Sequence, residues 1–219
     1  MVKLLPTAEN STRGDAVHSR MMMGLIMAGL MAVIFTPSTM ASTDDLALNA
    51  RNLLVNASFE KGQYSPTGLP TGWSTSEFAN TSQFVWLDHV SFAGRKSVQI
   101  ISATPNDARW TQPVAVKPDT SYELSGWVKT KNVQADRSLV SDAGANVSIL
   151  ECISGNCFIR TPGIIGTHDW TRGSTCFTTD ATTTQVTVAA RLGMYAGNAT
   201  GKAEFDQLDL RGRPAGCKR

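Results

Sequence analysis

Three acidic residues stand close together near the end of the chain, in the segment Ala203–Leu210 (AEFDQLDL). They are Glu204, Asp206 and Asp209, and clustered carboxylates can perform glycoside hydrolysis, in which one acid protonates a leaving oxygen while another attacks the sugar. Apolar residues of the same segment have β-strand spacing with one irregularity typical of a bulge: Phe205, Leu208 and Leu210. The segment therefore predicts acids on an ordered strand, either as catalysts or with Asp206 as a single metal ligand.

Other catalytic chemistries have few candidate residues. Once a leader is removed, His89 and His168 are the remaining histidines, so a Ser-His-Asp arrangement has only two candidates for its histidine. The sequence has no HExxH, P-loop or GxSxG motif. A polysaccharide lyase needs Arg, Tyr and His together on one sheet, and only Arg191, Tyr195 and His168 could supply them.

An uncharged apolar run of fifteen residues, Met21–Phe35, follows a polar start. A membrane span needs roughly 20 residues, so the run predicts a signal peptide, with cleavage after Ala41. We expect a leader at 1–41, alternatively an uncleaved anchor, then a short linker at 42–51, one domain at 52–212 and a tail at 213–219. Either alternative places the domain outside the cytoplasm, secreted to the extracellular space or the periplasm.

The part that follows the leader is nearly neutral. Its net charge is +1 after Lys3, Arg13, Arg20, Glu9 and Asp15 are removed. Such a chain has no strong field to steer nucleic acid or an anionic membrane. Its size is that of one domain with a single core.

The four cysteines predict two disulfides, because an exported chain meets an oxidising compartment. Four cysteines allow three pairings. We favour Cys152 with Cys157, since the intervening ISGN is typical of a hairpin tip, which leaves Cys176 with Cys217. A zinc site is the alternative, but the cysteine spacing fits no usual ligand pattern.

Short apolar alternations separated by Gly, Pro, Asn and Thr recur from residue 52 onward, with no helical period. This pattern predicts an all-β, two-sheet β-sandwich, a jelly roll. The expected strands are residues 53–55, 84–87, 97–102, 110–116, 121–130, 146–151, 158–160, 170–177, 185–192 and 203–210. Residues 132–144 are expected to form a long loop of the kind that often rims a binding site.

Six pieces of sequence, in order, resemble the carbohydrate-binding modules of families 4, 9, 16 and 22. They are NLLVNASFEKG, PTGWST, HVSFAGRKSVQI, WTQPVAVKPDTSYELSGWVKT, THDWTRGSTCFTT and AEFDQLDL, and the likeness covers 52–210. The resemblance implies a galactose-binding-like jelly roll, one structural calcium ion and a polysaccharide ligand in a groove on one sheet or at its rim.

The same resemblance implies the metal ligands. It places the carboxylates of Glu60 and Asp206 side by side, because the first and last strands pair. Calcium takes six to eight oxygens, and the others would come from the backbone of the opening stretch and of the loop between Ser91 and Lys96. In the alternative interpretation, Glu60 caps a turn and Asp206 makes an ordinary hydrogen bond.

Sugar recognition needs flat aromatic faces and a few fixed polar groups. Strand parity places Trp127 and Ser125 on a polar face, with Ser148, Thr187, Ala189 and Arg191 beside them if their strands are neighbours. The predicted carbohydrate-binding residues are Trp110, Gln112, Trp127, Arg191 and Tyr195. Trp73 and Trp170 are expected in the core.

Laminarinase-like jelly rolls carry an acidic triplet of the form E-x-D-x-x-E, which the closing strand resembles. The last acid here is Asp209, one methylene shorter, and acid-base geometry tolerates little displacement. We therefore expect a non-catalytic, monomeric polysaccharide-binding module, with a separate carbohydrate-active enzyme as a partner. A jelly-roll hydrolase or lyase, and a surface adhesion domain, are the alternatives.

Overall fold

The computed structural model describes residues 51–63, 68–136, 143–195, 197–213 and 216–217. The predicted leader and all of the linker except Arg51 lie outside the described residues. Within the described part of the chain, no helix is long and apolar enough to cross a membrane.

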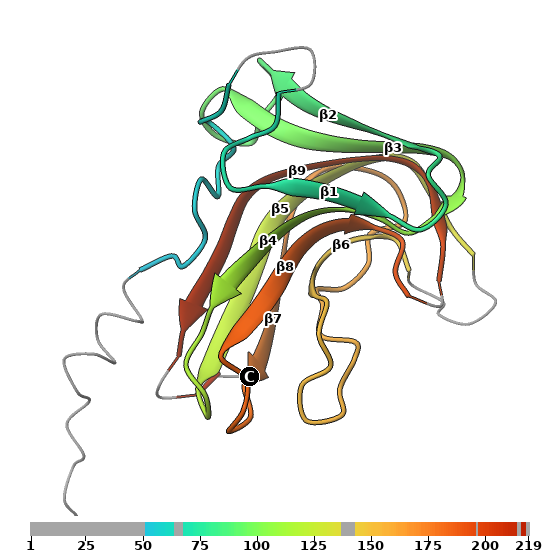
Figure 1. Cartoon of the computed structure of the whole chain (residues 1–219). Helices are drawn as coiled ribbons and strands as arrows, with labels where there is room; N and C mark the ends of the chain where they lie inside the picture. Colours follow the sequence, from blue (N-terminus) through green and yellow to red (C-terminus); the bar gives the residue numbers. More distant parts are fainter. Residues whose placement is uncertain (1–50, 64–67, 137–142, 196, 214–215, 218–219) are drawn as a thin grey trace, which may run out of the picture. The chain divides into compact units, whose positions relative to one another are not determined.

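Within the described residues, nine antiparallel strands form two sheets (Figure 1). The four-stranded sheet has the order β1-β4-β8-β6, and the five-stranded sheet has the order β2-β3-β9-β5-β7. The strands are β1 (Ser74–Glu77), β2 (Ser82–Asp88), β3 (Lys96–Asn106), β4 (Ala108–Ala115), β5 (Ser121–Ala135), β6 (Ala145–Ile149), β7 (Gly166–Thr178), β8 (Gln185–Leu192) and β9 (Ala199–Gly212). This confirms the predicted all-β sandwich.

The core lies between the two sheets and consists of alternate residues of their strands. The largest fully buried side chains include Trp110, Tyr122, Phe59 and Phe205. Burying one such side chain is worth about 1.5–3 kcal/mol, so this layer is the main source of stability. Trp73 is also in the core, as predicted.

Two expected strands are absent from the described residues and one strand was missed. The segment at 53–55 makes a backbone bond from Leu53 N to the Leu210 carbonyl, but the side chain of Asn52 takes the next ladder positions, bonding to the Leu208 carbonyl and the Leu210 amide. The segment at 158–160 makes only an isolated bridge with β6. The missed strand, β1, is entirely polar and has no apolar alternation. Strand β5 continues to Ala135, into the expected loop, and 137–142 lie outside the described residues.

The predicted bulge in the closing strand is confirmed. Ser125 pairs with Asp209 and Trp127 with Asp206, so one residue of β5 faces two residues of β9. Gln207 lies in the bulge with a φ of 48°. The bulge keeps Leu208 in the core although Phe205 also points there.

Both predicted disulfides are present. Cys152 bonds to Cys157 across the tip that contains the Ile153–Asn156 bridge, and Cys176 on β7 bonds to Cys217. The second disulfide attaches the C-terminal segment to the edge strand of the five-stranded sheet.

Candidate functional site

The topology divides the predicted sugar-binding face between two sheets. Strand β5, with Ser125 and Trp127, belongs to the five-stranded sheet, whereas β6 and β8, with Ser148 and Arg191, belong to the four-stranded sheet. Each sheet has an outer face, directed away from the core. The expectation that Trp127 and Arg191 lie on one polar face is therefore wrong, because side-chain parity does not determine which strands are neighbours.

Trp110 is a core residue. Its side chain is 1% exposed, packs edge-to-face on Phe84 with ring centroids 5.7 Å apart, and donates from Nε1 to the Gln99 carbonyl. A ring with no exposed face cannot stack on a sugar, so its predicted role in ligand contact is corrected.

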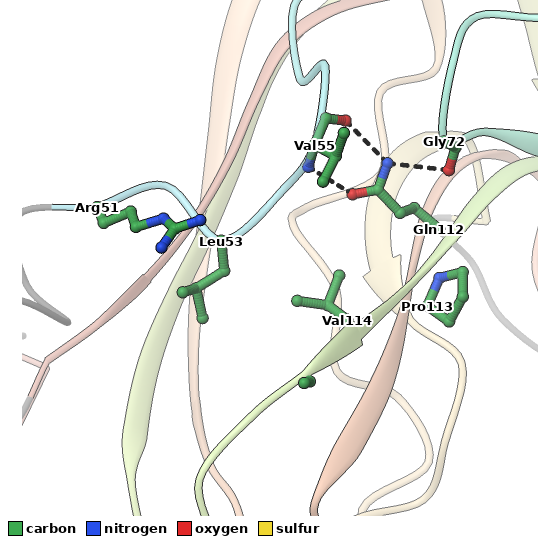
Figure 2. A pocket seen from close by; sticks show the side chains of 8 residues that line it. Arg51, Leu53, Val55, Gly72, Gln112, Pro113 and Val114 are labelled. Carbon is green, nitrogen blue, oxygen red and sulfur yellow. Dashed lines mark hydrogen bonds between the residues drawn. The ribbon is translucent and has the colours of Figure 1, made fainter.

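Gln112 lines a pocket of about 520 Å³ between the opening segment and β4 (Figure 2). Its amide oxygen accepts from Val55 N at 2.7 Å, and its amide nitrogen donates to the carbonyls of Val55 and Gly72. Both N–H groups are thereby used. Gln112 fastens the opening segment to the sheet and has no donor left for a ligand, which corrects its predicted role as well.

The pocket lies along the free edge of β4. Val116 N donates to the Thr184 carbonyl on the β8 side, so by alternation Pro113 and Ala115 direct their backbone groups to the other edge. Strand β1 pairs with β4 only as far as Thr111. Proline at this edge removes one of the donors that would invite another strand.

A polar row crosses the whole outer face of the four-stranded sheet near one end. It follows the pairs Ser76–Arg109, Arg109–Arg191 and Arg191–Asn146 on four neighbouring strands. The next row on the same face has small or hydroxyl side chains: Ser74, Thr111, Ala189 and Ser148. The part of the predicted polar face that β6 and β8 supply, Ser148, Ala189 and Arg191, is therefore present on this sheet.

Asp107 joins the two arginines of the first row. Its carboxylate accepts two hydrogen bonds from Arg191, both at 2.6 Å, and one from Arg109 at 2.8 Å. Arg109 also donates to the hydroxyl of Ser76. Asp107 and Arg191 are each 6% exposed, so Arg191 is a fixed, desolvated group with a net positive cluster around it and is not a solvated surface charge.

Three polar atoms of these two rows lack a hydrogen-bond partner among the described residues: Asn146 Oδ1, Ser148 Oγ and Arg109 Nε. Each is removed from solvent, and leaving a buried polar group unsatisfied costs about 1–3 kcal/mol. Clustering of three such atoms on one face is the kind of cost that a binding site carries.

Two exposed aromatic side chains lie in the segments that follow β1 and β8, at the same end of this sheet. Phe78 follows β1, donates its backbone N–H to the Asp107 carbonyl and is 82% exposed. Tyr195 lies three residues beyond β8 and is 76% exposed. The structure thus brings the predicted residues Arg191 and Tyr195 to one end of the sheet and adds Asp107, Arg109 and Phe78, which the sequence analysis did not single out.

Glu60 and Asp206 hold the loop between β2 and β3. Asp206 Oδ2 accepts from the backbone N–H groups of Phe92 and Ala93, and Glu60 Oε1 accepts from those of Arg95 and Lys96. The pKa of Asp206 is raised to about 6, mainly by burial and in smaller part by the negative charge of nearby Glu60, although three backbone N–H groups act in the opposite direction.

This acid pair suits a hard cation. Two carboxylates whose charges repel one another are oxygen donors of the kind that calcium prefers, although four backbone N–H groups of the loop already donate to them. The described residues contain no cluster of three or more His, Cys, Asp or Glu, so backbone carbonyls must complete any coordination shell. The Ser91 hydroxyl donates to the Gly94 carbonyl and keeps its oxygen lone pairs, whereas the Lys96 ammonium lies by Asp88 and Trp86, so Lys96 could contribute only its backbone oxygen.

The acids of the predicted hydrolytic triplet have separate partners. Glu204 Oε1 accepts from Gln99 Nε2, Asp206 accepts from the β2–β3 loop, and Asp209 forms an ion pair with Arg211 at 2.7 Å. The residues of the lyase alternative are divided between the sheets, since His168 lies on β7 of the five-stranded sheet, whereas Arg191 lies on β8 of the other sheet and Tyr195 follows β8.

Trp127 belongs to an aromatic cluster on the outer face of the five-stranded sheet. Its ring stacks on that of Phe92 with centroids 3.7 Å apart, and Trp170 lies edge-on to Phe92 at 6.4 Å. Trp170 is partly exposed and lies outside the core cluster, which corrects its predicted core position.

No protein-family model matches the chain, and no curated protein matches it. Among solved structures, the chain is similar to the carbohydrate-binding module TmCBM61 in complex with β-1,4-galactotriose (18% identity, 73% of this chain and 97% of that one, TM-score 0.47). It is also similar to the CBM22-1 xylan-binding domain of Paenibacillus barcinonensis Xyn10C (16% identity, 71% and 91%, TM-score 0.44). A third similar structure is the enzymatically active domain of bacteriophage CBA120 tailspike protein 4 (14% identity, 74% of this chain, TM-score 0.49), of which the chain spans 21%. Carbohydrate-binding modules thus recur among the similar structures, and the ligands named for them are properties of those proteins.

Proposed function

We propose that this protein is an exported, non-catalytic carbohydrate-binding module whose polysaccharide ligand lies across the outer face of the four-stranded sheet. The observation that carries the proposal is the combination at one end of that sheet. Arg109, which is partly exposed and held by Asp107 and Ser76, and the next row of small or hydroxyl side chains lie on a face whose end carries two exposed aromatic rings. Sugar hydroxyls supply both donors and acceptors, and pyranose rings supply apolar faces for aromatic side chains.

The fixed geometry of the row favours binding. Asp107 holds the Arg191 guanidinium through two hydrogen bonds, so little side-chain freedom is left to lose when a ligand arrives. Arg109, whose side chain is 22% exposed, is the charged member of the row that a glycan hydroxyl can reach.

The test is retention on affinity gels cast with neutral β-glucans and xylans, using Phe78→Ala and Tyr195→Ala. Both side chains are largely exposed, so stability should change by no more than about 0.5 kcal/mol. Each variant should bind about three- to tenfold more weakly if an aromatic contact is lost. Phe158→Ala is the matched control, because Phe158 is an exposed aromatic next to the Cys152–Cys157 disulfide, near the opposite end of β6. Unchanged retention of both variants, or an equal loss in the control, would contradict the proposal.

We also propose that Glu60 and Asp206 hold a structural calcium ion together with backbone carbonyls of the loop, including those of Ser91 and Lys96. The ion would neutralise the two acids and fix the loop to β9. By binding linkage, the melting temperature should fall on adding chelator and recover with Ca²⁺. A verified metal-free sample whose melting temperature does not respond to Ca²⁺ would remove the ion from the proposal and leave the glycan site untouched.

A further inference from the structure

The outer face of the five-stranded sheet carries a second feature that the proposed function does not use. We call it the aromatic-lysine patch: Phe92, Trp127, Trp170, Lys129, Lys131 and Lys202. Phe92 lies flat on Trp127 with an interplanar angle of 11° and is itself 41% exposed. The patch therefore presents one ring face and the edge of a second ring to solvent.

The lysines adjoin these rings on the same face of the sheet. Trp127, Lys129 and Lys131 alternate along β5, and Lys131 pairs directly with Lys202 on β9. Like charges directly opposite one another in an antiparallel pair are destabilising. The repulsion is only partly offset, since the Lys202 ammonium lies 3.3 Å from Glu204 Oε1 and the Lys129 ammonium 3.1 Å from Asp169.

Glu204 already supplies one negative charge beside Lys202, so Lys131 is the cation of the pair that is left for an anionic ligand. Glu204 is 6% exposed, and its Oε2 has no hydrogen-bond partner among the described residues. An anion next to Lys131 and Lys202 would relieve the repulsion between the two ammonium groups. It would also leave Glu204 with the contacts to Lys202 and Gln99 that it already has.

We propose that the aromatic-lysine patch is a second binding surface, specific for a polysaccharide that carries carboxylate groups. A sugar ring stacks on the exposed face of Phe92 beside Trp170, and carboxylates along the chain meet Lys131 and Lys202. The proposal does not depend on the site on the four-stranded sheet, because the two surfaces lie on different sheets.

A uronate polymer fits the patch better than single-stranded nucleic acid. Stacking aromatics beside cations are also a nucleic-acid signature. However, nucleic-acid grooves follow a continuous phosphate chain with a positive field, whereas here Asp169 and Glu204 adjoin two of the three lysines. A uronate ring carries its carboxylate beside an apolar ring face, so one ring can stack on Phe92 while the carboxylate of a neighbouring ring meets the lysine pair, which suits a surface whose excess cations are confined to one place.

The experiment compares binding of the full chain to polygalacturonate, to its methyl ester and to a thymidine oligonucleotide, at low and moderate salt. The wild-type protein should bind polygalacturonate, lose most of that affinity on the ester, and bind more weakly as salt increases. Equal binding to the ester, or binding to the oligonucleotide as tight as to polygalacturonate, would overturn the proposal.

Two double variants isolate the patch. Lys131→Gln/Lys202→Gln should weaken polygalacturonate binding about tenfold. Lys61→Gln/Lys117→Gln removes the same charge from residues outside the strands of this sheet and should bind within about twofold of wild type. Phe92→Ala should weaken binding while leaving its salt dependence intact, because it removes the stacking face and no charge. Equal weakening in the two lysine pairs would refute a specific patch. Because the neutral-glycan assay uses other residues, its failure would leave these results interpretable.

Discussion

Replacing Asp107 with Asn should destabilise the domain substantially, although the side chain lies on the outer face of a sheet and not in the core. The substitution keeps the size of the group and removes its charge, leaving the Arg191 guanidinium with neutral acceptors only. Arg191 and Asp107 are each 6% exposed, so the positive charge would remain desolvated. Breaking a buried ion pair by removing one partner costs about 3–5 kcal/mol, and the retained Asn oxygen puts this case near about 3 kcal/mol.

For a domain of this size, 1 kcal/mol corresponds to about 2–4 °C, so the melting temperature should fall by about 6–12 °C. Thermal unfolding followed by circular dichroism measures it. The control is Asp88→Asn, since the Asp88–Arg95 pair has a similar 2.7 Å contact but an arginine that is 59% exposed, and little change is expected there.

A second variant separates charge burial from loss of shape. Asp107→Leu/Arg191→Met replaces the two most buried charges by apolar groups and should recover most of the lost stability, as buried ion pairs often allow, because the remaining Arg109 is 22% exposed and keeps the Ser76 hydroxyl as an acceptor. If Asp107→Asn melts with the wild type, or if the apolar pair is no better than the single variant, the view of this cluster as a desolvated charge held by one carboxylate is refuted.

Three further outcomes are expected. Cys217→Ser, which opens a disulfide spanning 41 residues, should cost about 4 kcal/mol against about 2 kcal/mol for Cys152→Ser, whose disulfide spans 5, as measured by denaturant unfolding. The hydrogen-bonded Arg213 holds the pKa of Glu123 below its usual value. The stability from this pair is therefore present above the unfolded pKa and declines as the pH falls through the lower folded value. Glu123→Gln should reduce the fall of the melting temperature at acidic pH, and an unchanged pH profile would exclude the pair. Gly94→Ala should lower the melting temperature, because Gly94 has a φ of +78° and an added Cβ would collide with Glu60 Oε1, which holds the loop between β2 and β3. A variant as stable as wild type would show that the loop is not held there.

Alternation and turn residues predicted the sandwich, because period-two burial is a local property of each strand. The closing strand shows this best: its core-facing residues and its bulge were both read correctly. The hairpin disulfide was also predictable, since four residues between cysteines leave few geometries. The polar strand β1 was not, because no apolar residue marks it.

The order of strands within the sheets was not predictable from parity. Strand β5 lies between β9 and β7, which are distant in sequence, so Trp127 came to a different sheet from Arg191. Arg191 could be placed on an outer face, but its partner Asp107 precedes another strand and only the β4–β8 register brings them together. Trp110 is an aromatic residue of the kind that stacks on sugars, but its side chain points into the core and is not accessible to a ligand.

The meeting of the opening segment with β9 has a mechanical consequence. Asn52 and Leu53 are joined to Leu208 and Leu210 by three hydrogen bonds, so the opening segment and the end of β9 lie side by side. A force pulling these two ends apart would open those contacts one after another, while the Cys176–Cys217 disulfide would keep β7 attached to the far tail. Tension along the chain would therefore separate the margin of the sandwich first, with both sheets still intact.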